Sequence, residues 1–164
     1  MNFCPECGSK VEAKQIDHAL RFVCINNECA GIYWNNPTPV VAALVKSGGD
    51  YILARNKSWP KGIFSLITGY LEAGEEAEAA VLREVSEELG LTGEVVHYLG
   101  HHMFKEKNQL ILAFEVHATG TIVPGEELAE IKQVSVGELA AYNFKPLYIT
   151  EAVIAQWRRV SHQC

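Results

Sequence analysis

GYLEAGEEAEAAVLREVSEELGL, residues 69–91, is the most informative segment of this 164-residue chain. Its second half has apolar residues at helical spacing, Val85 and Leu89 among them, and Gly90 follows where a left-handed helix cap is favoured. We therefore predict a helix over residues 77–89 whose apolar face packs into the core.

Three acidic side chains cluster on this predicted helix. Glu84, Glu87 and Glu88 are spaced i, i+3 and i+4, so their carboxylates project from one face. Carboxylates this close raise one another's pKa and repel unless the face is solvated or holds a cation. Oxygen-only clusters select hard cations such as Mg²⁺ or Mn²⁺ and leave room for substrate phosphates. A solvated acidic helix is the alternative interpretation.

The loop before the helix carries its own signals. Gly69 and Gly74 allow backbone conformations that other residues disfavour. Glu75 stands just ahead of the helix, where the positive end of the helix dipole favours a carboxylate. We predict that Arg83 pairs with Glu75 and pins the loop to the helix.

Four of the five cysteines form two close pairs. Cys4 and Cys7 make a CxxC motif, and Cys24 and Cys29 follow with four residues between them. Disulfides are disfavoured in a reducing compartment, whereas two such pairs match a tetrahedral site that holds one Zn²⁺ through four thiolates. Two ordinary buried pairs or disulfides are the alternative. Cys164 has no evident partner.

The segment around these cysteines is too short to fold by burial alone. About 30 residues bury little apolar surface, so we expect the zinc ion to act as the core of a small ribbon. Nucleic-acid binding is the alternative role for such a ribbon. The ribbon's basic residues are outnumbered by acids: Lys10, Lys14 and Arg21 stand against Glu6, Glu12, Asp17 and Glu28. This balance argues against phosphate binding, and we predict a structural ribbon.

Apolar runs and turn signals predict a mixed α+β domain after the ribbon. Pro37 and Pro39 mark a connector, because proline cannot donate to a sheet ladder. The predicted strands cover 40–46, 51–55, 63–68, 94–104, 110–117 and 128–136, and a second predicted helix covers 148–160. The expected organisation is a zinc ribbon over 1–34, a linker over 35–39 and an α/β sandwich domain over 40–164.

Composition narrows the classes of partner. The chain has a net charge of −6 and is 48% hydrophobic, so it lacks the basic surface that holds nucleic acid, and no nucleic-acid partner is expected. The apolar run from Val40 to Val45 is far shorter than the roughly 20 residues that cross a bilayer. The first residues show no signal-peptide pattern, so we expect a cytoplasmic location without membrane attachment.

The motif Gly69-x5-Glu75-x7-Arg83-Glu84-Val85-x-Glu87-Glu88-x-Gly90-Leu91 resembles the signature box of the Nudix hydrolases, and every specified position is filled. A four-cysteine ribbon followed directly by such a domain is similar to the NADH pyrophosphatase branch of that family. The resemblance implies a Nudix-type α/β/α sandwich with a mixed sheet, preceded by a small N-terminal zinc ribbon. It also implies metal-dependent hydrolysis of the pyrophosphate bond in a nucleoside diphosphate derivative.

The resemblance assigns roles to individual residues of the box. Glu84 and Glu88 would be ligands of Mg²⁺ or Mn²⁺, and Glu87 would be a ligand or would position the attacking water. The backbone carbonyl of Thr68 would be a further ligand, as in relatives. Gly69, Glu75 and Arg83 would be structural residues of the site.

Relatives often add a glutamate from a later loop. Glu127 fits this role best here, and Glu126 and Glu130 are the alternatives. Which catalytic carboxylate is the general base varies across the family, so none is singled out among the box glutamates and Glu127. Relatives also suggest a homodimer.

The residues after the box bear on the substrate. The NADH pyrophosphatase branch carries a motif SQPWPFPxS there, whereas residues 100–109 read GHHMFKEKNQ. Since the tryptophan and the prolines are missing, ADP-ribose, FAD and NAD(H)-like substrates are expected alike. The charged run 105–107 is expected to form a less ordered wall. Trp34 and Tyr70 are the aromatic residues best placed to stack on a base, with simple packing as the alternative.

Two other functions are the alternatives to a small-molecule hydrolase. A Nudix-fold binding or regulatory module would need a degraded box, and this box is intact. An RNA-cap-type hydrolase would have to hold a long polyanion, and the acidic charge of the chain counts against that.

Overall fold

The computed structural model describes residues 1–161, and Cys164 lies outside these residues. The chain divides into two compact units, Met1–Pro37 and Thr38–Cys164. Within the described residues, no helix is long and apolar enough to cross a membrane.

The N-terminal unit is a small antiparallel sheet, consistent with the expected ribbon, although its individual strands were not predicted from the sequence. Its strands are β1 (Val11–Ile16), β2 (Ala19–Cys24) and β3 (Ile32–Tyr33), in the order β1-β2-β3. Cys4 and Cys24 are its buried side chains, whereas Phe3 and Leu20 are well exposed. Because this unit buries so little apolar surface, we expect its stability to depend on the cysteines.

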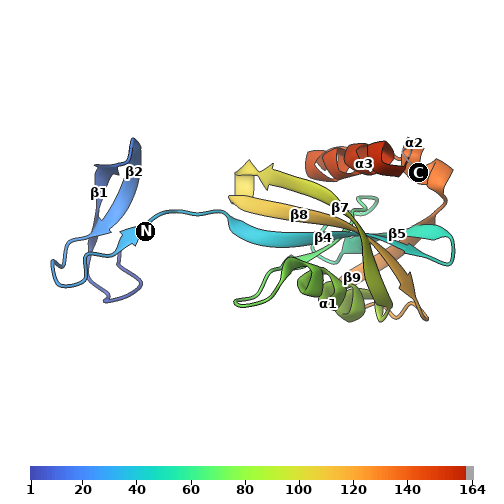
Figure 1. Ribbon diagram of the computed structural model, residues 1–164, viewed down its shortest axis with the longest axis horizontal. Coiled ribbons are helices and arrows are strands. Elements are labelled where there is room, and N and C mark those ends of the chain that lie inside the picture. The colour runs from blue at the N-terminus through green and yellow to red at the C-terminus, as the bar shows by residue number, and fades with distance from the viewer. Residues whose placement is uncertain (162–164) are drawn as a thin grey trace. The chain divides into compact units, whose positions relative to one another are not determined.

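The C-terminal unit is built on a mixed sheet (Figure 1). Its strands are β4 (Thr38–Ser47), β5 (Asp50–Asn56), β6 (Ile67–Tyr70), β7 (Thr92–Phe104), β8 (Gln109–Thr119) and β9 (Leu128–Val134). The order is β7-β8-β4-β5-β9, and β6 pairs with the first half of β4. The β4–β8 pair is parallel and the other pairs are antiparallel, so the predicted mixed sheet is confirmed.

Helices cover both faces of this sheet. They are α1 (Ala77–Leu89), α2 (Val136–Ala141) and α3 (Tyr148–Ser161), with one turn of 3-10 helix, η1 (Lys105–Lys107), between β7 and β8. Figure 1 shows α1 on one face and α3 on the other. Alternate residues of β4 serve the two layers: Val41, Ala43 and Val45 join the cluster packed on α1, whereas Val40, Ala42 and Leu44 join the cluster packed on α3. The predicted α/β/α sandwich is confirmed.

The segment 69–91 folds as expected. The helix α1 covers the predicted residues 77–89, and Gly90 ends it in the left-handed conformation with φ +67°. The N–H of Gly90 donates to the carbonyl of Ser86 at 2.9 Å, which closes the last turn.

Three expectations about the strands were wrong. The strand predicted over 63–68 lies at Ile67–Tyr70, because Ser65 still bridges Ala54 of β5 before the chain crosses to β4. Pro39 lies within β4 rather than in a linker; its carbonyl accepts a hydrogen bond from Leu71, a contact that needs no proline N–H.

The third error concerns the strand predicted over 128–136, which ends at Val134. Ser135 instead caps α2, since its hydroxyl accepts a hydrogen bond from the Glu138 N–H and the Glu138 carboxylate accepts one from the Ser135 N–H.

Candidate active site

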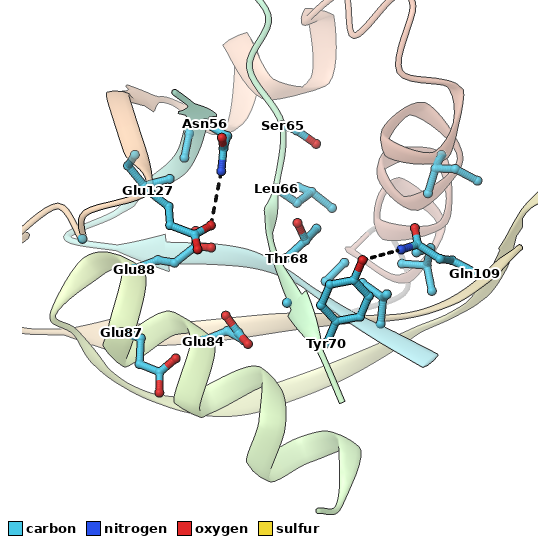
Figure 2. Close-up of a pocket in the computed structure, with 18 of the residues that line it drawn as sticks. Asn56, Ser65, Leu66, Thr68, Tyr70, Glu84, Glu87, Glu88, Gln109 and Glu127 are labelled. Carbon is cyan, nitrogen blue, oxygen red and sulfur yellow. Dashed lines mark hydrogen bonds between the residues drawn. The ribbon is translucent and has the colours of Figure 1, made fainter. Parts of the chain in front are cut away.

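The acidic face of α1 borders a cavity of about 620 Å³ in the C-terminal unit. Figure 2 shows Glu84, Glu87 and Glu88 on the α1 side of this cavity, with Glu127 beside Glu88. The buried residues Val81, Val85 and Leu89 anchor the opposite part of α1 in the core. The glutamates are therefore carried on a rigid element and not on a loop.

The glutamates differ in their exposure to solvent. The Glu84 side chain is 13% exposed and the Glu87 side chain is 59% exposed. The pKa of Glu88 is raised from its ordinary value to about 7, mainly by burial and then by the charges of Glu84, Glu127 and Glu87, in that order. A divalent cation would relieve this repulsion, so the donor set fits Mg²⁺ or Mn²⁺.

The opposite end of the cavity is apolar and aromatic. The residues that line this end come from β4, from β6 and the residue before it, from the β7–β8 hairpin, and from α3 and the residue before it. They are Val40, Leu66, Tyr70, Phe104, Gln109, Ile111, Leu147, Ile149 and Val153. The cavity therefore joins a metal-binding type of surface to a surface suited to a nucleobase. Thr68, whose carbonyl was expected to be a metal ligand, lines the cavity between the two ends.

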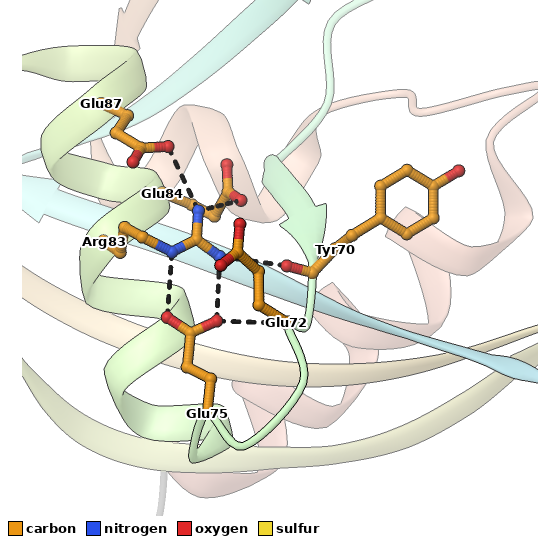
Figure 3. Close-up of polar contacts among 6 residues, drawn as sticks. All are labelled: Tyr70, Glu72, Glu75, Arg83, Glu84 and Glu87. Atoms are coloured by element: carbon orange, nitrogen blue, oxygen red, sulfur yellow. Dashed lines mark hydrogen bonds and ion pairs between the residues drawn. The ribbon is translucent and has the colours of Figure 1, made fainter.

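Arg83 holds the site together, as Figure 3 shows. Its guanidinium donates to both oxygens of Glu75 at 2.9 and 3.0 Å, and the predicted ion pair is confirmed. It also donates to Glu84 at 2.7 Å, to Glu87 at 3.2 Å and to the carbonyl of Tyr70 at 3.1 Å. The hydrogen bond from Arg83 lowers the pKa of Glu75. Arg83 thus ties the loop to α1 and orients two candidate ligands.

Gly69 is needed for space and not for an unusual φ. A Cβ atom at this position would lie 1.8 Å from the Glu84 carboxyl carbon, which is an impossible contact. The absence of a side chain at Gly69 therefore allows Glu84 to reach the cavity.

We expect Gly69→Ala to raise the Mg²⁺ concentration needed for half-maximal activity by about tenfold, because Glu84 must leave its position. The melting temperature should change little, since the displaced atoms end a flexible side chain. Gly137→Ala, at a position with open space around it, is the matched control. An unchanged Mg²⁺ requirement in Gly69→Ala would show that Glu84 is not a ligand.

The structure separates the three candidates in the later loop. Glu130 is held by the buried Arg55 at 2.7 Å, so its carboxylate is already paired. Glu126 and Glu127 both line the cavity. Asn56 donates to Glu127 at 3.4 Å, and Glu127 is the one whose charge raises the pKa of Glu88. The geometry favours Glu127, in agreement with the sequence-based choice.

Of the two aromatic candidates, Tyr70 lies at the site. Its side chain is well exposed and lines the cavity, and its hydroxyl accepts a hydrogen bond from Gln109 at 3.2 Å. Trp34 belongs to the N-terminal unit, where the Arg21 guanidinium stacks over its ring at 5.5 Å and donates to its carbonyl. Its proposed stacking on a base therefore stays a prediction.

The wall formed by residues 105–107 is better organised than the sequence suggested. The η1 turn is fixed to α3, because Tyr148 packs on Phe104 at 5.8 Å and donates a hydrogen bond to Glu106. Phe104, Lys107 and Gln109 all line the cavity; Lys107 belongs to the wall expected from the sequence, whereas Phe104 and Gln109 were not named as site residues.

The four cysteines of the N-terminal unit form a second candidate site. Among the described residues, they are the group of ligands whose atoms all lie within 4.8 Å of one another. The Cys4–Cys29 and Cys7–Cys24 sulfur distances are 3.8 and 3.5 Å, and all four thiols are free. Four Zn–S bonds of about 2.3 Å in tetrahedral geometry place sulfurs about 3.8 Å apart. The donor set fits a structural zinc ion.

The raised pKa of Glu88 predicts a pH dependence of stability. The unfolded carboxyl ionises near its ordinary value of 4.5, whereas the folded one keeps its proton to about 7. The stability from the protonated form is therefore fully present below the unfolded pKa and is lost as pH rises through about 7.

We expect Glu88→Gln to melt at a higher temperature than the wild type at about pH 8 and at a similar temperature at about pH 5. The comparison is made without added divalent metal, by scanning calorimetry across this range. Added Mg²⁺ should stabilise the wild type more than the variant. A melting difference that does not grow with pH would show that Glu88 is not strained by its neighbours.

Comparison with known proteins identifies the family. The family model for the NUDIX domain matches residues 36–157, and the chain belongs to the Nudix family. The resemblance that residues 69–91 carry is thereby confirmed.

Curated relatives share this similarity. The chain is 33% identical over 132 residues to the NAD-capped RNA hydrolase NudC of Pseudomonas aeruginosa. The match covers 80% of this chain and 46% of the relative. It is 43% identical over 103 residues to the NAD-capped RNA hydrolase NudC of Mycobacterium tuberculosis. This match covers 62% of this chain and 30% of the relative. The chain spans less than half the length of these two relatives.

Solved structures support the fold. A NUDIX hydrolase from Nitrosomonas europaea matches with a TM-score of 0.73 at 22% identity, over 84% of this chain and 80% of that one. An ADP-ribose pyrophosphatase from Streptococcus suis matches with a TM-score of 0.58 at 18% identity, over 76% of this chain and 93% of that one. At these identities the likeness shows the fold alone.

Proposed function

We propose that this protein is a divalent-metal-dependent pyrophosphohydrolase that cleaves the diphosphate bridge of a nucleoside diphosphate derivative. The observation that carries the proposal is the two-ended cavity, with glutamates at one end and an apolar, aromatic surface at the other. A substrate with a charged bridge and a flat base has the same division of chemistry.

Each end of the cavity has a part in the proposed reaction. Glu84, Glu88 and Glu127 would hold Mg²⁺ or Mn²⁺, with Glu87 as a ligand or as the group that positions water. The metal, when bound, neutralises the bridging phosphates. Water forms a bond to one phosphorus, the bond to the bridging oxygen breaks, and two phosphomonoesters leave. Tyr70 and the apolar end would place the base.

An RNA-cap-type hydrolase is the second candidate. The net charge of −6 argues against a nucleic-acid partner, yet the curated relatives are named as hydrolases of NAD-capped RNA. The same diphosphate bridge joins the two halves of a dinucleotide cap. We therefore include capped RNA among the substrates to be tested.

The ribbon and the linker belong to the same proposal. We propose that residues 1–34 form a zinc ribbon and that the Nudix hydrolase domain begins with β4 at Thr38, two residues earlier than expected, with 35–37 as the connection. The cysteine distances support the first part and the family match over residues 36–157 supports the second.

Steady-state kinetics on NADH, ADP-ribose, FAD and a short NAD-capped RNA test the proposed substrate class. We expect hydrolysis with Mg²⁺ or Mn²⁺, and kcat/KM values for the first three substrates within about two orders of magnitude of one another. The reason is that residues 100–109 lack the motif of the NADH pyrophosphatase branch. A preference for NADH above about a thousandfold would contradict the expectation of similar kcat/KM values. The absence of turnover with every substrate would overturn the proposed function.

A further inference from the structure

The basic residues of the cavity point to a feature of the substrate beyond the diphosphate bridge. Two basic residues line the cavity, Arg83 and Lys107, against six glutamates: Glu72, Glu84, Glu87, Glu88, Glu126 and Glu127. The guanidinium of Arg83 already forms ion pairs with Glu75, Glu84 and Glu87. It has little capacity left for a ligand.

Lys107 is different. Among the described residues, no carboxylate lies within ion-pair distance of its ammonium group, whose recorded contact is the face of the Phe104 ring at 5.7 Å. An ammonium group that lines a cavity without an acidic partner is available to an anionic ligand.

The backbone that carries Lys107 is held in place. The N–H of Asn108 donates to the Lys105 carbonyl at 3.1 Å, and the Asn108 carbonyl accepts from Thr38 at 2.9 Å. The contacts of Tyr148 with Phe104 and Glu106 fix the other side of the turn. Lys107 is thus presented to the cavity from an ordered turn, which reduces the entropy lost when it binds a ligand.

Lys107 lies at the end of the cavity that the glutamates do not occupy. Phe104, beneath its ammonium group, belongs to the apolar surface that suits a base. The scissile bridge belongs at the glutamates, where a cation is expected. The anion that meets Lys107 must therefore belong to the nucleoside half of the substrate. A nucleoside carries negative charge there only when its ribose bears a further phosphate.

We propose that Lys107 is a specificity-determining residue that binds a phosphate on the ribose of the substrate's nucleoside half. The inference rests on the proposed function for the location of the bridge. The phosphate has two sources: a 2′-phosphate, as in a phosphorylated dinucleotide, or a 3′-phosphate, as in the next linkage of a capped RNA. Both present negatively charged phosphate oxygens to the lysine: the 2′-phosphate is a monoester with up to two charges, and the 3′-linkage of an RNA is a diester with one.

Binding of product-like ligands tests this without turnover. Calorimetry with Mg²⁺ compares AMP, adenosine 2′,5′-bisphosphate and adenosine 3′,5′-bisphosphate on the wild type, Lys107→Gln, Lys107→Arg and Lys105→Gln. Lys105 lies in the same turn, carries the same charge and does not line the cavity, so it is the matched control.

We expect at least one bisphosphate to bind the wild type about tenfold more tightly than AMP. Lys107→Gln should remove this advantage, while Lys107→Arg and Lys105→Gln keep it. An advantage for the 2′-isomer identifies a dinucleotide phosphate, and an advantage for the 3′-isomer identifies an RNA-type linkage. Equal affinity of all three ligands for the wild type, or equal losses in Lys107→Gln and Lys105→Gln, would overturn the proposal. The hydrolysis panel decides the proposed function separately, because these ligands contain no diphosphate bridge.

Discussion

Glu88→Gln is expected to lower kcat/KM by about a hundredfold or more while the protein stays folded. The substitution keeps the size of the side chain and removes one charge from the shell of the cation. Metal ions supply several kcal/mol of transition-state stabilisation, and each factor of ten in rate corresponds to about 1.4 kcal/mol. The cost of burying a charge at Glu88, and the repulsion from its neighbours, disappear at the same time, so stability should not fall. Glu87→Gln is expected to reduce the rate similarly.

The matched control for these variants is Glu78→Gln. Glu78 lies on the same helix, in its first turn, is exposed and does not line the cavity. It should keep the wild-type rate and the wild-type Mg²⁺ dependence. A Glu88→Gln protein with unchanged rate and unchanged metal dependence would show that Glu88 is not a functional ligand.

Removal of zinc is expected to unfold the N-terminal unit. The purified protein should hold about one zinc ion per chain, and Cys24→Ser should lose it together with the order of β1, β2 and β3. Structural zinc sites contribute about 10–16 kcal/mol of apparent binding free energy, far more than this unit gains from apolar burial. Hydrogen bonds with the side chain and backbone of Ser9 are the main causes that lower the pKa of Cys7 to about 6, whereas burial raises the pKa of Cys24, so zinc binding must displace a proton from Cys24.

Metal analysis and limited proteolysis measure the two effects of zinc removal. In Cys24→Ser, residues 1–37 should become sensitive to protease, while the C-terminal unit stays resistant because it has its own two apolar clusters. Cys164→Ser is the control that should retain zinc. A wild-type protein without zinc, or with four thiols that react freely in the native state, would contradict the zinc ribbon.

The local features of the site could be predicted because their causes lie within one segment. The spacing of Glu84, Glu87 and Glu88 follows from helical geometry, and the cap at Gly90 and the pair of Arg83 with Glu75 act over short separations. Such features depend little on the rest of the fold. The assignment of their chemical roles stays a proposal.

The opposite wall of the cavity could not be predicted, because distant segments form it. Phe104, Lys107 and Gln109 reach the site only when β7 and β8 pair and α3 packs against them. The order of η1 depends on Tyr148, far along the chain. Asn56, which orients Glu127, is likewise brought there by the pairing of β5 with β9. The charged and flexible side chains of residues 105–107 indicated a less ordered wall and not the ordered turn that the structure shows.

A buried network on the α3 side shows the same limit. Glu115 is 4% exposed, and its carboxylate accepts a hydrogen bond from Tyr51 at 2.7 Å and makes another with His97 at 3.0 Å. A ring nitrogen of His117 lies 3.5 Å from the same carboxylate. Burial raises the pKa of Glu115, but the bonds with Tyr51 and His97 outweigh it and lower the pKa overall. His97 reaches Glu115 only because β7 pairs with β8, and this pairing is not visible in either strand alone, whereas His117 lies two residues from Glu115 on β8 itself.

Phosphorus NMR of ADP-ribose incubated with the protein tests most directly whether the glutamate-lined cavity hydrolyses a diphosphate bridge with the help of a divalent cation. With Mg²⁺, which is diamagnetic and leaves the phosphorus resonances sharp, the diphosphate resonances should disappear and two phosphomonoester resonances should replace them. Without added metal, or with Glu88→Gln, the diphosphate resonances should persist. Cleavage at the same rate without metal and in Glu88→Gln, or release of a product that keeps the diphosphate bridge, would contradict the account.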